Sequence, residues 1–143
     1  MTAAGLTTGS GGNISVLAED GKVAITPSGI EYHELTPEQI VVTDRRGQAV
    51  GPGLKPSSEL SFHLALYDLR PDIRSVVHTH SVYATTFACL REEIPAVHYL
   101  VGFSGHSVRV APYATFGTPE LARNITATIE DDQAVLMANH GLV

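Results

Sequence analysis

The chain has 143 residues, which is enough for one domain with a single hydrophobic core. Hydrophobic residues make up 43% and charged residues 17%, a balance that excludes a disordered chain. The formal net charge of −6 argues against a nucleic-acid partner, and no apolar run reaches the ~18–20 residues that span a membrane.

The first half of the chain predicts a hairpin, a helix start and a longer helix. Asp20-Gly21 favours the positive φ angles of a tight hairpin turn. Thr36, with Pro37 and Gln39 after it, has the pattern of a helix N-terminus. The expected elements here are strands over 14–18, 23–26, 40–43 and 49–50, and a helix that Ser57 or Ser58 caps and that ends near Arg70.

The second half alternates strands with helices. Thr118 and Pro119 predict the start of a helix whose apolar residues recur at helical spacing. The segment 134–138 is apolar throughout, which predicts a central strand. Hairpins mixed with helical crossovers indicate a mixed sheet covered by helices. The other expected elements are strands over 74–80 and 108–111, a helix from Ser81 to about Leu90, and loop or short strand over 93–105.

The counts of cysteine and histidine restrict the kind of metal site that the chain can build. Cys89 is the single cysteine, which excludes an intramolecular disulfide and a thiolate zinc cluster. The 7 histidines leave imidazole and carboxylate as ligands for a transition metal. Because the N-terminus lacks the basic and apolar regions of a secretory signal, we expect a cytoplasmic protein.

The sharpest local motif is His78-Thr79-His80, at the end of a predicted strand. Alternate side chains of a strand share a face, so His78 and His80 can converge on one divalent cation. The alternative is a hydrogen-bonded pair of histidines on a half-buried strand. His140 also follows a predicted strand and is a candidate third ligand, although a lone histidine at such a position is more often structural.

Glu59 lies in the first turn of a predicted helix, where the helix dipole stabilises a carboxylate whether or not it takes part in chemistry. The functional interpretations are a fourth metal ligand or a general base beside the metal. His63 lies four residues later on the same helix face. It can orient the Glu59 side chain from the side away from the metal, or it can be a packed histidine with no such role.

Small residues form three clusters that are candidates for binding an oxyanion. Glycines expose backbone N–H groups, serines add hydroxyl donors, and a helix N-terminus stabilises phosphate. Each cluster alone also fits an ordinary turn, and none has the lysine of a Walker A motif. The clusters are residues 8–13, 26–29 and 56–58.

Taken in order, these pieces resemble the class II (zinc-dependent) aldolase/epimerase family, and within it the L-fuculose-1-phosphate aldolases. Matching blocks run along nearly the whole chain in the family's order, which is far stronger evidence than one histidine pair. The blocks are GGNIS at 11–15, ITPSGI at 25–30, KPSSE at 55–59, VVHTHS at 76–81, IPAVHY at 94–99, APYATFGT at 111–118 and NHGLV at 139–143.

The resemblance implies a role for each matching residue. His78, His80 and His140 would hold Zn²⁺ or another divalent metal, and Glu59 would serve as resting metal ligand and catalytic base. Tyr99 would reach the active site of a neighbouring subunit, near the aldehyde oxygen; the alternative for Tyr99 is a packed interface residue. The phosphate contacts would be Asn13, Ser28, Gly29, Ser57 and Ser58.

The activity that the resemblance implies is retro-aldol cleavage of a ketose 1-phosphate. L-Fuculose 1-phosphate, for example, would give dihydroxyacetone phosphate and lactaldehyde. A sugar-phosphate 4-epimerase is the main alternative, but those enzymes resemble PSSD where this chain has Glu59. A dehydratase of the same superfamily is a further alternative. A non-catalytic module like the adducin head need not keep the histidines and glutamate that are present here.

The resemblance also implies a fold and an assembly. The fold would be a three-layer α/β/α sandwich around a mixed, mostly antiparallel sheet, and the assembly a homotetramer with sites between subunits. We expect one domain over 1–143. The family's helix before the GGN loop and its helices after the HGL turn have no counterpart in this sequence. The chain therefore looks like a catalytic core truncated at both ends.

Overall fold

A four-stranded antiparallel sheet forms the first part of the structure, a computed structural model that describes residues 1–143. Its strand order is β3-β2-β1-β4, and each neighbouring pair is antiparallel. The predicted hairpin is confirmed, because Ser15 pairs with Ile25 across the turn. The strands are β1 (Asn13–Leu17), β2 (Val23–Ile25), β3 (Val41–Thr43) and β4 (Ser75–His78).

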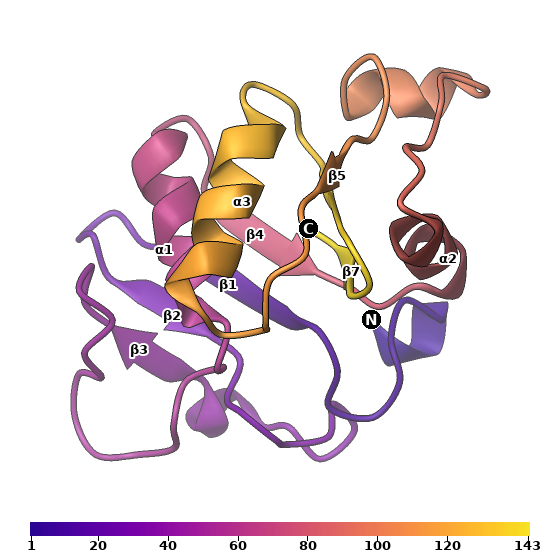
Figure 1. Cartoon of the computed structure of the whole chain (residues 1–143). Coiled ribbons are helices and arrows are strands. Elements are labelled where there is room, and N and C mark those ends of the chain that lie inside the picture. Colours follow the sequence, from indigo (N-terminus) through magenta and orange to yellow (C-terminus); the bar gives the residue numbers. More distant parts are fainter.

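A second, three-stranded sheet continues from the edge of the first. Its strands are β5 (Val110–Ala111), β6 (Leu136–Met137) and β7 (Gly141–Leu142), with β6 in the middle as predicted. A bridge between Thr79 and Leu142 places β7 beside the end of β4. Figure 1 shows the two sheets side by side, with the C-terminus lying between β4 and β5.

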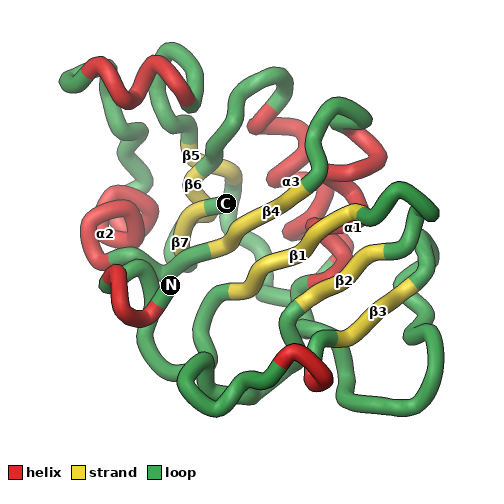
Figure 2. Tube along the Cα trace, turned by 180° about the vertical axis from the view of Figure 1, so that it is seen from behind, coloured by secondary structure: helices red, strands yellow, loops and turns green.

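Helices cover the sheets in layers. Helix α1 (Leu60–Leu69) packs against α3 (Pro119–Ile129), and both belong to the larger apolar core together with residues of β2 and β4. Helix α2 (Val82–Leu90) packs instead on β6 and β7. In Figure 2, α2 lies on one side of β4 and α1 and α3 on the other.

The strand β6 shows why the layers form. Successive side chains of a strand point to opposite faces. Leu136 accordingly packs with residues of α2, while Met137 belongs to the core that contains α1 and α3. Both side chains are fully buried. The predicted three-layer arrangement with a mostly antiparallel sheet is therefore confirmed.

Some predicted boundaries are wrong. Helix α1 begins at Leu60, because the Glu59 backbone N–H donates to Ser57 Oγ in a turn before the helix. The predicted strand over 49–50 is reduced to one bridge, between Thr43 and Ala49. The 93–105 segment contains a 3-10 helix, Tyr99–Phe103. Further 3-10 turns are Thr2–Ala4 and Pro37–Gln39.

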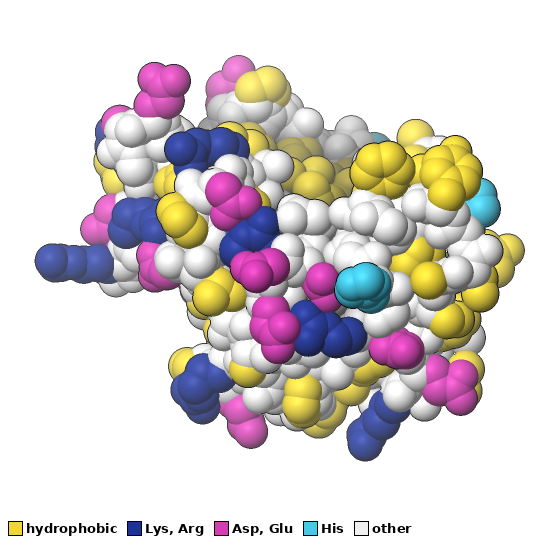
Figure 3. Space-filling view, turned by 90° about the horizontal axis from the view of Figure 1, so that it is seen from above, with side chains coloured by type: hydrophobic (Ala, Val, Ile, Leu, Met, Phe, Trp, Pro, Cys, Tyr) yellow, Lys and Arg dark blue, Asp and Glu magenta, His cyan; other side chains and the backbone are white.

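The predicted helix starts at Thr36 and Thr118 are confirmed. Thr36 N–H donates to Gln39 Oε1 at 2.8 Å, and Leu121 N–H donates to Thr118 Oγ1 at 3.3 Å. No helix has both the length and the apolar character that crossing a membrane needs. Figure 3 shows acidic and basic side chains interspersed on one face, while apolar side chains gather toward the side where α2 lies.

Candidate metal centre

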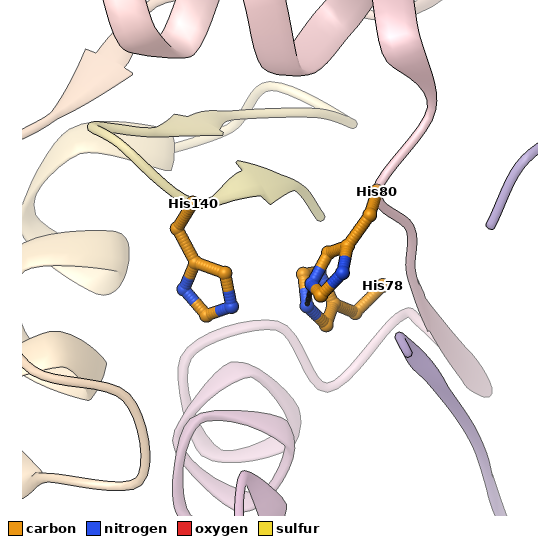
Figure 4. Close-up of side chains that lie close together, drawn as sticks. All are labelled: His78, His80 and His140. Carbon is orange, nitrogen blue, oxygen red and sulfur yellow. Dashed lines mark hydrogen bonds between the residues drawn. The ribbon is translucent and has the colours of Figure 1, made fainter. Parts of the chain in front are cut away.

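Three histidines converge from segments that are far apart in the sequence. His78 ends β4, His80 lies two residues beyond it, and His140 lies in the turn between β6 and β7. The ligand nitrogens of all three lie within 4.8 Å of one another. Figure 4 shows the three rings pointing toward one another. The Thr79–Leu142 bridge explains the convergence, since it fixes the His140 turn against the end of β4.

A hydrogen bond fixes the orientation of the His78 ring. His78 Nδ1 lies 2.8 Å from the carbonyl oxygen of Leu142, so Nδ1 carries the hydrogen and donates. Its Nε2 faces the rest of the cluster, 2.9 Å from His80 Nε2 and 3.2 Å from Glu59 Oε2. A ring nitrogen that donates to a backbone carbonyl is the usual support of a metal-binding histidine.

Burial favours the neutral form of the other two rings. Desolvation and the neighbouring imidazoles lower the pKa of His80 to about 4. Desolvation also lowers the pKa of His140, against the opposing effect of the Glu59 charge. Because metals bind neutral imidazole, the folded chain holds these rings in the form that binds.

Glu59 closes the cluster from the N-terminus of α1. Its Oε2 lies 3.2 Å from His78 Nε2, and its Oε1 lies 3.3 Å from His140 Nε2. Burial alone would raise the pKa of Glu59, but the hydrogen bond and charge of His78, with smaller contributions from His140 and Asn13, lower it to about 2. The carboxylate is therefore ionised inside the protein.

The donor set fits a divalent metal. Three imidazole nitrogens and one carboxylate are ligands that zinc accepts in protein sites. Glu59 Oε1 is buried yet has no hydrogen bond of good geometry, and an orphaned carboxylate oxygen is costly unless something positive binds it. We therefore identify the residues around Glu59 as a candidate metal centre.

Glu59, His80 and His140 open onto a cavity of about 310 Å³ that also contains the predicted phosphate contacts, while His78 lies buried behind them. No lysine or arginine lines it, so an anion there would meet hydroxyl, amide and backbone N–H groups. The lining residues are Ser10, Gly11, Gly12, Asn13, Pro27, Ser28, Gly29, Ser57, Ser58, Glu59, His80, Phe116 and His140.

Three aromatic residues, Tyr99, Phe116 and Tyr32, differ in where they lie relative to this cavity. Tyr99 is 76% exposed and does not line the cavity of its own chain. Phe116 lines it, and in the sequence it lies within the matching block 111–118. Tyr32 donates its hydroxyl to the carbonyl of Gly12 at 2.9 Å and supports the glycine loop. No sequence signal identified Tyr32, because this contact spans a long loop.

Comparisons with known proteins agree with this geometry. The whole chain, residues 1–143, matches the family described as Class II Aldolase and Adducin N-terminal domain. A 5-deoxy-D-ribulose 1-phosphate aldolase of Bacillus thuringiensis serovar kurstaki is 52% identical over 144 aligned positions, covering 100% of this chain and 68% of that protein. An L-fuculose phosphate aldolase of Escherichia coli K12 is 44% identical over 144 positions, covering 100% and 66%.

A solved structure of an L-fuculose 1-phosphate aldolase has the same fold. The TM-score is 0.95 at 48% identity, and the match covers 99% of this chain and 67% of that chain. The chain thus spans about two thirds of the length of these relatives. The predicted family is confirmed: the chain belongs to the class II aldolase and adducin N-terminal domain family, and its named relatives are aldolases.

Proposed function

We propose that the chain cleaves a ketose 1-phosphate by a metal-dependent retro-aldol reaction, giving dihydroxyacetone phosphate and a short aldehyde. One observation carries the proposal. A single cavity combines Glu59 and two histidines of the cluster, His80 and His140, with a rim of serines and glycines suited to a phosphate. Relatives named as aldolases of L-fuculose phosphate and 5-deoxy-D-ribulose 1-phosphate support it.

In this proposal the residues of the metal centre hold zinc. His78, His80 and His140 are the neutral ligands, and Glu59 is the charged one. When bound, a divalent cation supplies Lewis-acid stabilisation of the negative charge that develops on substrate oxygens. The site therefore suits a reaction that passes through an enediolate.

The phosphate end of the substrate is held by neutral donors. In our proposal Ser28 and Gly29 approach it from one loop and Ser57 and Ser58 from the turn before α1, while Asn13 contributes from the start of β1. Fixing the phosphate fixes the position of the carbon–carbon bond that breaks, which lowers the entropic part of the barrier.

Proton transfers complete the proposed reaction. The C4 hydroxyl gives its proton to the Glu59 carboxylate as it becomes the aldehyde, the bond between C3 and C4 breaks, and the electron pair stays on C3 as the enediolate. Glu59 then delivers a proton to C3. We place the Tyr99 hydroxyl of a neighbouring subunit near the aldehyde oxygen, in a cytoplasmic homotetramer. The exposure of Tyr99 together with exposed Leu100 and Phe103 supports an interface there.

The test is a coupled assay for dihydroxyacetone phosphate with two substrates. L-Fuculose 1-phosphate should give lactaldehyde as the second product, and 5-deoxy-D-ribulose 1-phosphate should give acetaldehyde. A chelator should abolish the activity and Zn²⁺ should restore it. Conversion to an isomeric sugar phosphate without release of dihydroxyacetone phosphate would indicate a 4-epimerase instead.

A matched pair of variants tests the metal centre within the same assay. His140→Ala should lower both the metal content and the activity, because it removes one of three neutral ligands. His33→Ala should leave both unchanged, since the His33 side chain is 70% exposed and lies outside the cluster. Equal metal content in the two variants would contradict the assignment.

A further inference from the structure

A chain of buried hydrogen bonds runs from Glu59 away from the cavity. Asn13 Nδ2 lies 2.9 Å from Glu59 Oε2, and Asn13 Oδ1 lies 2.5 Å from His63 Nε2. His63 Nδ1 lies 2.7 Å from Ser15 Oγ, which lies 2.8 Å from the Tyr67 hydroxyl. All five residues are at most 5% exposed.

The carboxylate at one end fixes the direction of every hydrogen bond. A carboxylate only accepts, so the Asn13 amide must turn its N–H₂ group toward Glu59 and its oxygen toward His63. That oxygen also only accepts, so His63 carries its hydrogen on Nε2. Burial lowers the pKa of His63 to about 3, so the ring has one hydrogen at neutral pH and its Nδ1 must accept.

The remaining two bonds follow from the same reasoning. Ser15 donates its hydroxyl hydrogen to His63 Nδ1 and can then only accept from Tyr67. Each group along the chain therefore donates toward Glu59, beginning at Tyr67. A chain in which every hydrogen bond points one way is polarised along its length.

We propose, on the basis of the proposed function, that His63 is a positioning residue that acts on Glu59 through Asn13. This hydrogen-bond chain, the relay, runs from Tyr67 to Glu59 and holds Glu59 Oε2 in place. Glu59 Oε1 has no hydrogen bond of its own and is therefore the oxygen that moves the proton. The Asn13 amide has a second N–H, so bridging Glu59 leaves one donor for a phosphate. Helix α1 supplies His63 and Tyr67, and Glu59 directly precedes it, which explains why their spacing is fixed.

The first experiment observes the relay without using activity. Long-range ¹H–¹⁵N spectra of the zinc-loaded protein should show His63 protonated on Nε2 only. Asn13→Ala removes the acceptor of the Nε2–H group and should mix the two tautomers, whereas Tyr67→Phe leaves the Asn13 and Ser15 contacts of the ring in place and should preserve the Nε2–H form. A ring protonated on Nδ1, or on both nitrogens, in the wild-type protein would overturn the proposal.

The second experiment measures proton exchange at C3 of dihydroxyacetone phosphate. His63→Leu removes the donor to Asn13 and should lower kcat roughly 10–100-fold, with KM and zinc content unchanged. His63→Gln can still donate to Asn13 and should recover most of the rate. A folded His63→Leu variant with wild-type kcat would overturn the positioning role. Absence of exchange in the wild-type protein would instead overturn the proposed function, while the tautomer would still test the relay.

Discussion

Glu59 is a buried carboxylate surrounded by the polar groups of the site. It is 5% exposed, and His78, His140 and Asn13 surround its carboxylate. Burying a charge without such partners would be very unfavourable. Its neighbours therefore make Glu59 both a candidate ligand and a candidate base, and an uncharged isostere separates the two roles.

Glu59→Gln keeps the size of the side chain and removes its capacity to carry a proton. We expect the variant to bind metal through the three histidines. Proton exchange at C3 of dihydroxyacetone phosphate should fall by ~10²–10⁴-fold, the usual contribution of a general base. Exchange is measured by loss of deuterium label, and metal content by elemental analysis.

Glu120→Gln is the matched control for that variant. Glu120 also lies at the start of a helix, but it is exposed and outside the cavity. Its replacement should change neither metal content nor exchange. Normal exchange in Glu59→Gln would remove Glu59 as the base, and loss of metal there would show that the carboxylate is an essential ligand.

Individual residues differ in how far the sequence could predict them. Strand alternation suffices to bring His78 and His80 together. Nothing local predicts that His140 joins them, because its position depends on the bridge between Thr79 and Leu142. The resemblance supplied that residue. For His63, helical spacing correctly places it near Glu59, but the intermediate Asn13 comes from another element and could not be predicted.

At the scale of elements, the glycine loop before β1 determines how closely that strand's start approaches β4. Gly12 has φ +69°, and a Cβ there would lie 2.5 Å from the carbonyl oxygen of His78. Gly21, in the hairpin turn, has φ +82°, but a Cβ there would have no other atom within 4 Å. The two glycines share a left-handed backbone conformation and differ in whether there is room for a Cβ atom.

Substituting alanine at each glycine separates these two effects. Gly21→Ala should lower the free energy of unfolding by about 1 kcal/mol, the cost of a left-handed conformation. Gly12→Ala should lower it by about 3 kcal/mol, because overpacking is added. Urea denaturation measures both. Equal losses would show that the Gly12 loop relaxes and does not fix the position of His78.

Elements with their own local signals could be predicted, and those held only by distant partners could not. The N-terminus of α3 is specified by Thr118 and Pro119 themselves. The short strands β5 and β7 have two residues each and exist because β6 lies between them. Register and strand ends thus depend on tertiary contacts that no local pattern contains.

On the scale of the whole molecule, the layered fold places ionisable groups in a dry interior. His63 is fully buried, and desolvation lowers its pKa to about 3 from 6.5. Between these two values the unfolded chain binds a proton that the folded chain does not. Stability must therefore fall as the pH drops through 6.5 toward 3.

Acidification should accordingly destabilise the protein. From His63 alone, the free energy of unfolding at pH 5 should be about 2 kcal/mol below its value at pH 8, since 1.5 pH units below the unfolded pKa are worth that amount. Urea denaturation in the presence of a chelator measures this without the contribution of a bound metal. His63→Gln has no proton to gain, so its stability should fall less between pH 8 and pH 5. An identical pH dependence in the two proteins would mean that the buried ring is not held neutral.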